Sequence, residues 1–320
     1  EANELAIRMV KAVTGEHDVI ASEIGYHGNS NICVDISSYK FDGKGGDGAP
    51  ETTHVVPLPD QFRGIYSRNE GSKYAQHVEQ QVRSIEEKGR GVAGFICESI
   101  ISCGGQIELP EGYLETAYQS VRAAGGLCIA DEVQCGMGRV GTHWWGFELH
   151  NVIPDIVTIG KPLGNGHPLA AVVCTESVAK AFANGMEYFN TFGGNPVSSA
   201  IGTEVLRVVK EEGLRENASM VGDYLKMKLN ALSSDYPIIQ DVRGKGLFLG
   251  FELVDETNSP LPEEASYLVN RMRERGVLMS TDGKSNNAIK IKPPMVFSME
   301  NANELLAGIE IILQEDVMRI

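Results

Sequence analysis

Apolar and polar residues alternate along most of the chain in a way that predicts short buried strands separated by amphipathic helices. Apolar residues recur at helical spacing from Glu1 to Val13 and from Ser72 to Lys88. Short apolar runs bounded by turn residues, such as Val92 to Cys97, are typical of buried strands in a parallel sheet. The other predicted strands are Val19–Ala21, Leu127–Ala130, Ile156–Ile159 and Leu169–Cys174, and the other predicted helices are Pro110–Ala124, Val178–Ala183 and Val197–Lys210. This alternation indicates an α/β fold with a mostly parallel sheet flanked by helices.

The pattern changes at about Ile238, after which the predicted elements are shorter. They are a strand at 247–251, a helix at 263–275, a strand at 288–292 and a last helix at 300–313. We therefore predict two domains: a large domain over residues 1–236 and a small C-terminal α+β domain over residues 237–320. The glycine-rich stretch from Asp42 to Pro50 is expected to be an exposed loop.

The composition narrows the classes of function. Apolar residues make up 42% and charged residues 22% of the 320 residues, as in ordinary globular proteins. The formal net charge of −15 argues against binding to nucleic acid or to an anionic membrane. No apolar run approaches the ~20 residues of a membrane helix, and no signal peptide is expected at the start as given.

Cysteine usage points to a reducing compartment, and we expect a cytoplasmic location. None of the six cysteines forms a CxxC pair, so neither a zinc site nor a redox site is expected. Cys97, Cys128 and Cys174 lie in strand-like runs and should be small buried hydrophobic residues.

Two predicted strands end in residues that suit the chemistry of pyridoxal phosphate (PLP). One strand is followed by Asp131 and Glu132, and the other by Gly160, Lys161 and Pro162. In open α/β sheets, ligands bind beyond the carboxyl ends of the strands. PLP needs a lysine for its Schiff base and an acid on its pyridine nitrogen. Each residue alone is more commonly a loop or cap residue, and it is their combination in this order that favours PLP.

Three longer motifs strengthen this interpretation. They read ADEVQCGMGRVG, PDIVTIGKPLGNGHP and YFNTFGGNP. In these motifs the chain resembles the class III family of PLP-dependent aminotransferases, over essentially its whole length. The resemblance implies the PLP-dependent transferase fold of type I, with Lys161 as the Schiff-base lysine and general base and Asp131 as the acid on the pyridine nitrogen.

The same resemblance implies further cofactor contacts. Tyr26 would stack on one face of the ring, Val133 would pack on the other, and Gln134 would hydrogen-bond the ring oxygen. His27 and Glu98 are also expected at the cofactor. Thr191 would bond the cofactor phosphate of a neighbouring subunit, which implies a homodimer with shared sites. Taken singly, Tyr26 is a turn residue, Val133 a core residue, Gln134 a polar residue and Thr191 a helix cap.

One departure from the family concerns the N-terminus. In the family, a Ser-Gly-Ser type loop that holds the cofactor phosphate precedes the first helix, and this chain opens on Glu1. We expect that loop and part of the active-site entrance to be missing. An impaired or non-catalytic chain is therefore one alternative.

Other departures concern the substrate, expected to be a small primary amine. Many class III transaminases bind the substrate carboxylate with an arginine, where this chain has Lys290, followed two residues later by Lys292. Lysine lacks the bidentate fork that matches a carboxylate. The glutamate that masks that arginine corresponds to Cys103.

Together with GYHGNSNICVDISSYKFDGKGG, ESIISCGGQ and IKIKPPMVF, these changes resemble the ethanolamine-phosphate and phosphohydroxylysine phospho-lyases. We expect elimination of phosphate and ammonia from a phosphorylated amino alcohol, with Lys290 or Lys292 binding the phosphate. Transamination between an amine or amino acid and a keto acid is the alternative.

Overall fold

The computed structural model describes residues 1–66 and 68–319, and the chain divides into two compact units. The first comprises Glu1–Ser99, Leu109–Met137 and Trp145–Val209, and the second comprises Ile100–Glu108, Gly138–Trp144 and Lys210–Ile320. A domain boundary between residues 236 and 237 stays a prediction, because compactness alone does not show that a segment folds independently.

The first unit is built on a six-stranded sheet in which five strands are parallel. The strand order is β2 (Thr53–Val56), β1 (Asp18–Ser22), β3 (Val92–Glu98), β6 (Leu127–Asp131), β7 (Ile156–Ile159) and β8 (Ala171–Cys174). Only β8 pairs antiparallel, with β7. Every residue of β3 is buried, as expected for a central strand covered on both faces. The predicted mostly parallel sheet is thus confirmed.

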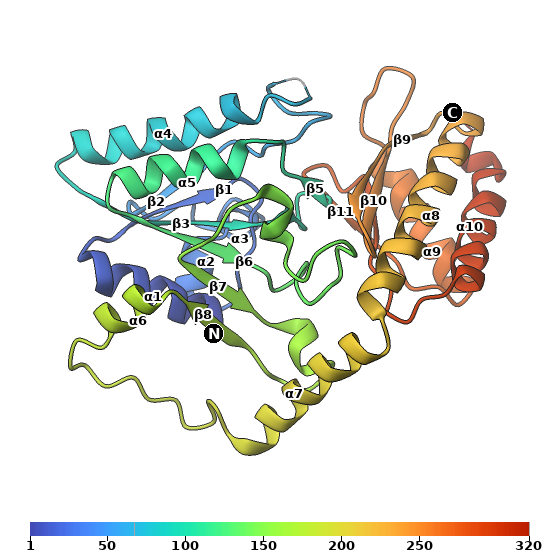
Figure 1. Ribbon diagram of the computed structural model, residues 1–320. Coiled ribbons are helices and arrows are strands. Elements are labelled where there is room, and N and C mark those ends of the chain that lie inside the picture. The colour runs from blue at the N-terminus through green and yellow to red at the C-terminus, as the bar shows by residue number, and fades with distance from the viewer. Residues whose placement is uncertain (67, 320) are drawn as a thin grey trace. The chain divides into compact units, whose positions relative to one another are not determined.

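Helices cover both faces of this sheet. Figure 1 shows α4 (Gly71–Glu87) and α5 (Tyr113–Ala123) on one face and α1 (Ala2–Thr14) and α6 (Glu176–Phe182) on the other. The apolar stripe of α1 packs against residues of β1, β6 and β7 in one buried cluster. The remaining elements are α2 (Asn31–Asp35), α3 (Ser38–Phe41), the 3-10 turns η1 (Gly146–His150) and η2 (Lys161–Gly164), and α7 (Pro196–Glu211). The stretch from Asp42 to Pro50 contains no helix or strand, as predicted.

The register of the sheet aligns three polar residues at one edge. Glu98 of β3 is the direct partner of Asp131 of β6, and Asp131 is in turn the direct partner of Thr158 of β7. Partners in parallel strands project to the same face of the sheet. The two acids therefore lie side by side where the strands end.

The second unit contains a four-stranded antiparallel sheet and three helices. The strand order is β11 (Ser280–Asp282), β12 (Ala288–Ile291), β10 (Phe248–Leu253) and β9 (Ile239–Lys245). Helices α8 (Leu214–Asp235) and α9 (Pro262–Glu274) pack against this sheet, and α10 (Met299–Leu313) packs against both helices. A hairpin of β4 (Ile100–Ile101) and β5 (Ile107–Glu108) and the turn η3 (Asp316–Met318) complete the unit. The sequence did not predict α8.

The cysteines mostly occupy the environments expected for them. All six are free thiols. Cys97 and Cys128 are fully buried, whereas Cys174 is only half-buried. The difference arises because Cys174 belongs to β8, the edge strand of the sheet. Within residues 1–66 and 68–319, no helix combines the length and the apolar character needed to span a bilayer.

Candidate functional site

All of the residues predicted to contact the cofactor, except Thr191, line one cavity of about 190 Å³ in the first unit. It lies at the edge where β3, β6 and β7 end. Its walls are formed by Glu1, Ala2, Asn3, Tyr26, His27, Gly28, Glu98, Asp131, Val133, Gln134, Gly160, Lys161 and Ala170. The α1 start, the 26–28 turn and the three strand ends therefore meet at one small cavity.

Three donors fix the carboxylate of Asp131, which is 3% exposed. Oδ2 accepts hydrogen bonds from His27 Nδ1 and Asn3 Nδ2, each at 2.8 Å. Oδ1 accepts one from the backbone N–H of Val133 at 3.0 Å. A carboxylate facing Nδ1 requires the imidazole proton on that nitrogen. The acid is thus held rigidly, with its orientation set by two side chains and its own turn.

Asn3 is a site residue that the sequence interpretation missed. It is buried, and its Nδ2 also donates to the carbonyl oxygen of His27 at 2.7 Å. One asparagine therefore joins Asp131 to the turn that carries Tyr26 and His27. Its partner carboxylate lies 128 residues away, and no local pattern signals such a contact.

One buried polar atom of Asn3 and one of His27 have no hydrogen-bond partner among the described residues. They are Oδ1 of Asn3 and Nε2 of His27. Buried polar atoms in folded proteins are nearly always satisfied by protein, water or ligand. These two atoms are consistent with a polar ligand in the cavity.

Lys161 is the first residue of the turn η2, which is separated from β7 by Gly160, and its side chain is exposed. A side-chain carbon added at Gly160 would lie 3.1 Å from Cγ1 of Val133. The glycine before the lysine therefore allows the turn to approach Val133 closely. Pro162 stiffens the turn, as its sequence predicted.

The aromatic and amide candidates have ordinary packing in this structure. Tyr26 is half-buried, and its ring makes an edge contact with the ring of Tyr39 at 5.7 Å between centroids. Lys40 Nζ lies 5.5 Å from the centroid of the Tyr26 ring. Gln134 is buried. Ring stacking by Tyr26 and a hydrogen bond from Gln134 stay predictions.

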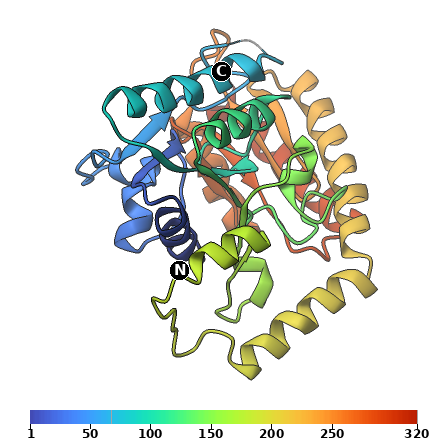
Figure 2. The same ribbon diagram turned by 60° about the vertical axis from the view of Figure 1, so that its left-hand side comes forward.

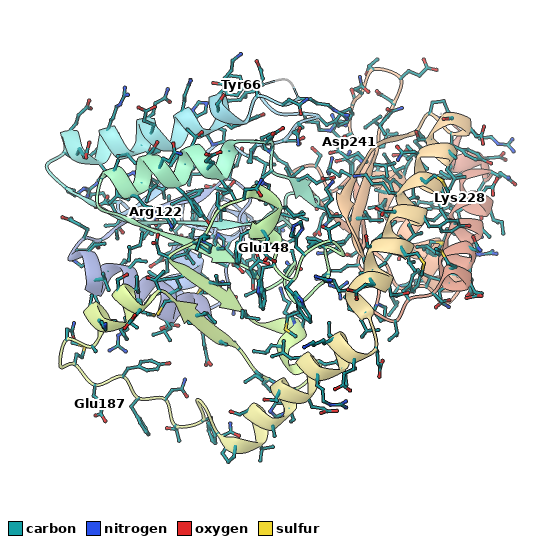
Figure 3. All side chains as sticks on the ribbon, in the orientation of Figure 1. Tyr66, Arg122, Glu148, Glu187, Lys228 and Asp241 are labelled. Carbon is teal, nitrogen blue, oxygen red and sulfur yellow. The ribbon has the colours of Figure 1, made fainter. Side chains whose placement is uncertain are left out.

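Thr191 lies apart from this cavity. It belongs to the irregular segment 183–195, which joins α6 to α7 and is drawn in full in Figure 2. Phe189 and Phe192 in the same segment are 75% and 80% exposed, and Figure 3 shows Glu187 there, turned away from the sheet. A role for Thr191 in a neighbouring subunit stays a prediction.

The predicted substrate residues all belong to the second unit. Lys290 Nζ pairs with Oδ2 of Asp282 at 2.7 Å, and Gln106 Nε2 donates to the same oxygen at 3.0 Å. Lys292 Nζ lies 5.5 Å from the ring centroid of Phe248, and Cys103 is buried. Phosphate binding by either lysine stays a prediction.

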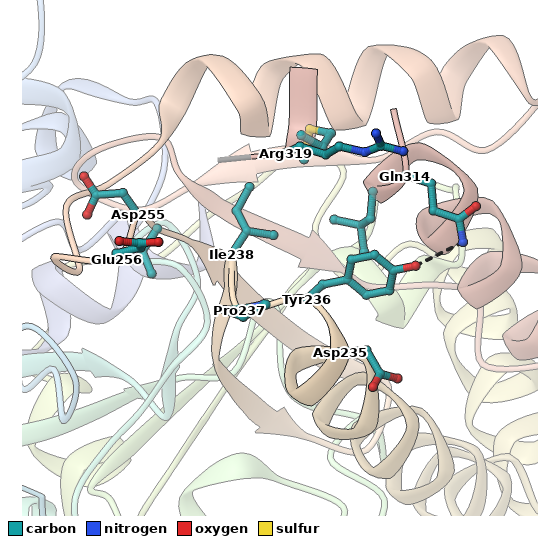
Figure 4. Close-up of a pocket in the computed structure, with 11 residues that line it drawn as sticks. Asp235, Tyr236, Pro237, Ile238, Asp255, Glu256, Gln314 and Arg319 are labelled. Atoms are coloured by element: carbon teal, nitrogen blue, oxygen red, sulfur yellow. Dashed lines mark hydrogen bonds between the residues drawn. The ribbon is translucent and has the colours of Figure 1, made fainter. Parts of the chain in front are cut away.

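A larger cavity of about 450 Å³ in the second unit contains none of the predicted residues. Figure 4 shows its walls, where Gln314 Nε2 donates to the hydroxyl oxygen of Tyr236 at 3.0 Å. Size therefore does not identify the site, and the amine and buried carboxylate of the smaller cavity do.

Comparisons with known proteins identify the family of this chain. The family described as aminotransferase class-III matches residues 1–313. A Drosophila melanogaster protein named alanine--glyoxylate aminotransferase 2-like is 49% identical over 318 residues, covering 96% of this chain and 64% of that protein. An Arabidopsis thaliana protein named alanine--glyoxylate aminotransferase 2 homolog 2, mitochondrial, is 44% identical over 315 residues, covering 97% and 64%. The chain thus spans less than two thirds of the length of either relative.

A solved structure gives the same result. The structure of a phospholyase from Arthrobacter in complex with phosphoethanolamine matches with a TM-score of 0.92 and 38% identity, covering 98% of this chain and 74% of that one. With the family match over residues 1–313, this shows that the chain belongs to the class III aminotransferases, a family of PLP-dependent enzymes.

Proposed function

We propose that the protein acts on a primary amine with PLP, and that it eliminates phosphate and ammonia from a phosphorylated amino alcohol. The observation that carries the proposal is the single cavity that joins the amine of Lys161 to the rigidly held carboxylate of Asp131. PLP chemistry requires these two groups at one site.

The residues of the cavity fit this cofactor in their chemistry. Lys161 would hold it through its amine, and Asp131 would hold the protonated pyridine nitrogen. Tyr26 and Val133 would contact the two ring faces, with Gln134, His27 and Glu98 around the ring edge. When bound, PLP supplies an electron sink for the charge left on the substrate carbon.

The protein's own groups then have separate tasks. Lys161 would accept the proton from the substrate carbon that bears the nitrogen. The Asp131 carboxylate stays in position for the ring nitrogen, because His27, Asn3 and the Val133 N–H hold it in place. Departure of phosphate and addition of water complete the reaction, so that one phosphorylated amino alcohol and one water give an aldehyde, ammonia and phosphate.

We favour elimination over transamination because of the residues that are predicted to bind the substrate. The position of the carboxylate-binding arginine is occupied by Lys290, whose charge is compensated by Asp282. A lysine presents a single point charge, which suits a phosphate better than a carboxylate. A carboxylate is matched best by the planar, two-pronged guanidinium group of an arginine. The phospholyase from Arthrobacter, whose structure contains phosphoethanolamine, supports this choice.

Transamination is the second candidate. It is favoured by the Drosophila and Arabidopsis relatives, both of which carry aminotransferase names. The two reactions share the cofactor and the first proton transfer, and they differ in whether the substrate loses a leaving group or exchanges its nitrogen.

One experiment separates the candidates. Full-length protein with PLP is given O-phosphoethanolamine without any keto acid, and phosphate and ammonia are measured over time. Sustained release of both in equal amounts is expected, and Lys161→Ala should release neither. Turnover that appears only after pyruvate and an amine are supplied would establish transamination. No turnover in either assay would leave the impaired, non-catalytic alternative.

We also propose that the protein is a homodimer in the cytoplasm. The exposed aromatic side chains around Thr191 support self-association. Sedimentation of the full-length protein should give the mass of a dimer, and Phe192→Ser should weaken it. Fractionation of the source cells tests the location, for which a mitochondrial signal would contradict the proposal.

A further inference from the structure

The carboxylate of Glu132, which follows Asp131, is fully buried and accepts hydrogen bonds from four donors. Oε1 accepts from Ser99 Oγ at 2.5 Å and from the backbone N–H of Phe147 at 2.9 Å. Oε2 accepts from the backbone N–H of Gly146 at 2.7 Å and from Cys135 Sγ at 3.7 Å. One side chain thereby connects the end of β3, the turn after β6 and the start of η1.

The backbone of Glu132 is fixed as well. Its N–H donates to the carbonyl of Thr158 on β7 at 2.9 Å, and its carbonyl accepts from the N–H of Gly136 at 3.1 Å. The first bond extends the pairing of β6 with β7 by one residue, and the second closes the turn. Glu132 is therefore anchored on both sides of the short segment that lines the cavity.

The side chain of Glu132 does not line the cavity, whereas its neighbours do. Asp131, Val133 and Gln134 all contribute to the walls. The position of these three residues depends on the path of the turn, and the Glu132 carboxylate sets that path. A side-chain carbon at Gly146 would lie 2.8 Å from Cβ of Ser99, so the segments around the carboxylate are packed too closely to move independently.

Burial opposes a charge at this position. It raises the pKa of Glu132 to about 7, and the hydrogen bonds from Ser99, Gly146 and Phe147 only partly offset this effect. The charge of the neighbouring residue Asp131 raises the pKa of Glu132 further. An apolar residue would avoid this penalty but could not gather four donors from three segments.

We propose that Glu132 is a positioning residue, which holds the turn so that Asp131, Val133 and Gln134 meet the cofactor ring at the right place. The inference rests on the proposed function, because it concerns the same cavity. It assigns a task to a residue that touches neither cofactor nor substrate.

Glu132→Gln tests this in the full-length protein, with Glu148→Gln as a matched control. Glutamine keeps the shape but turns an N–H₂ toward two of the donors. Glu148, labelled in Figure 3, belongs to the same turn η1, and its carboxylate accepts from the backbone N–H of Trp145 at 2.9 Å. Both variants should lower the thermal midpoint by a few degrees. Only Glu132→Gln should raise the dissociation constant of PLP, by about tenfold.

A second readout uses the protein without PLP. Hydrogen exchange in the peptide that contains residues 131–136 should speed up in Glu132→Gln and stay unchanged in Glu148→Gln, because only the first loosens that turn. Equal effects of the two variants on PLP affinity, or an unchanged affinity in Glu132→Gln, would overturn the proposal. Wild-type protein that binds no PLP would instead contradict the proposed function.

Ser99→Ala keeps the test usable if Glu132→Gln does not fold. It removes one of the four donors and leaves the carboxylate in place. The expected increase in the PLP dissociation constant is about threefold, with faster exchange in the same peptide. An affinity within the error of wild type would count against positioning by Glu132.

Discussion

Glu98 and Asp131 are direct partners on neighbouring parallel strands, and both are 3% exposed. The two acids lie at the strand ends and line one cavity together with Lys161. Asp131 is held there by His27, Asn3 and its own turn. The sheet register therefore places two acidic groups at the site, and local hydrogen bonds fix the orientation of Asp131.

Replacing Lys161 should remove covalent attachment of PLP without unfolding the protein. Lys161→Ala should lower kcat by about 10²- to 10⁴-fold, the range for loss of a general base. Borohydride reduction followed by peptide mass analysis should find no cofactor on residues 156–166. Lys180→Ala is the control, because Lys180 is an exposed lysine that pairs with Glu176 on α6. If both variants lost activity equally, Lys161 would have no specific role at the site.

Replacing Asp131 should lower the reaction rate more than it lowers the stability of the fold. Asp131→Asn retains one acceptor oxygen but presents an N–H₂ to one of its present donors. We expect kcat to fall by about 10²- to 10³-fold, as for loss of one electrostatic partner at the reacting centre. The absorption spectrum of bound PLP should change in parallel, because the ring nitrogen loses its counter-charge. Unchanged spectrum and kcat would show that Asp131 does not face the ring.

Glu132 should make stability depend on pH. Its folded-state pKa of about 7 lies above the ordinary value of 4.5, so the folded state binds the extra proton between these values. The free energy of unfolding should therefore be largest below about pH 4.5 as far as this group is concerned, and fall as pH rises to 7. The free energy of unfolding at pH values below 4.5 should exceed that at pH values well above 7 by about 3 kcal/mol. Urea unfolding between pH 5 and pH 8 measures it, and Glu132→Gln should flatten the profile.

Lys290 should affect substrate binding more than catalysis. In Lys290→Ala, the KM for O-phosphoethanolamine should rise about tenfold, because one charge-assisted contact is lost, while kcat changes little. The control is Lys228→Ala, an exposed lysine on α8 of the same unit. An unchanged KM would assign Lys290 to its pair with Asp282 alone.

Much of the fold could be predicted because its strands carry strong local signals. The predicted strand Ile156–Ile159 has the same bounds in the structure, and Val92–Cys97 differs by one residue. Helix α8 gave no comparable signal. Its buried face consists of Ala218, Val221, Gly222, Leu225 and Leu229, and a glycine in mid-helix lowers the helical propensity. That glycine is needed, because a side-chain carbon there would lie 2.1 Å from the carbonyl oxygen of Gly246.

Some residues of the candidate site could likewise be predicted from the sequence, and others could not. Lys161 and Asp131 could be found because each lies within two residues of the end of a short apolar run that predicts a strand. Asn3 could not, because only the fold brings it to Asp131. From the sequence, Glu132 was noted solely as the neighbour of Asp131. Its four hydrogen-bond donors lie up to 33 residues away from it along the chain, so no local pattern indicates them. Thr191 was chosen by resemblance, and the task proposed for it depends on a second subunit.

The antiparallel strand β8 limits how this enzyme can change. The connection that carries Lys161 leaves the sheet from β7 and returns to it at β8, with no intervening crossover helix. Both ends of the connection are anchored at one sheet edge, so insertions there would displace the lysine. Adaptation to new amines, in nature or in the laboratory, is therefore expected to leave the length of this connection unchanged.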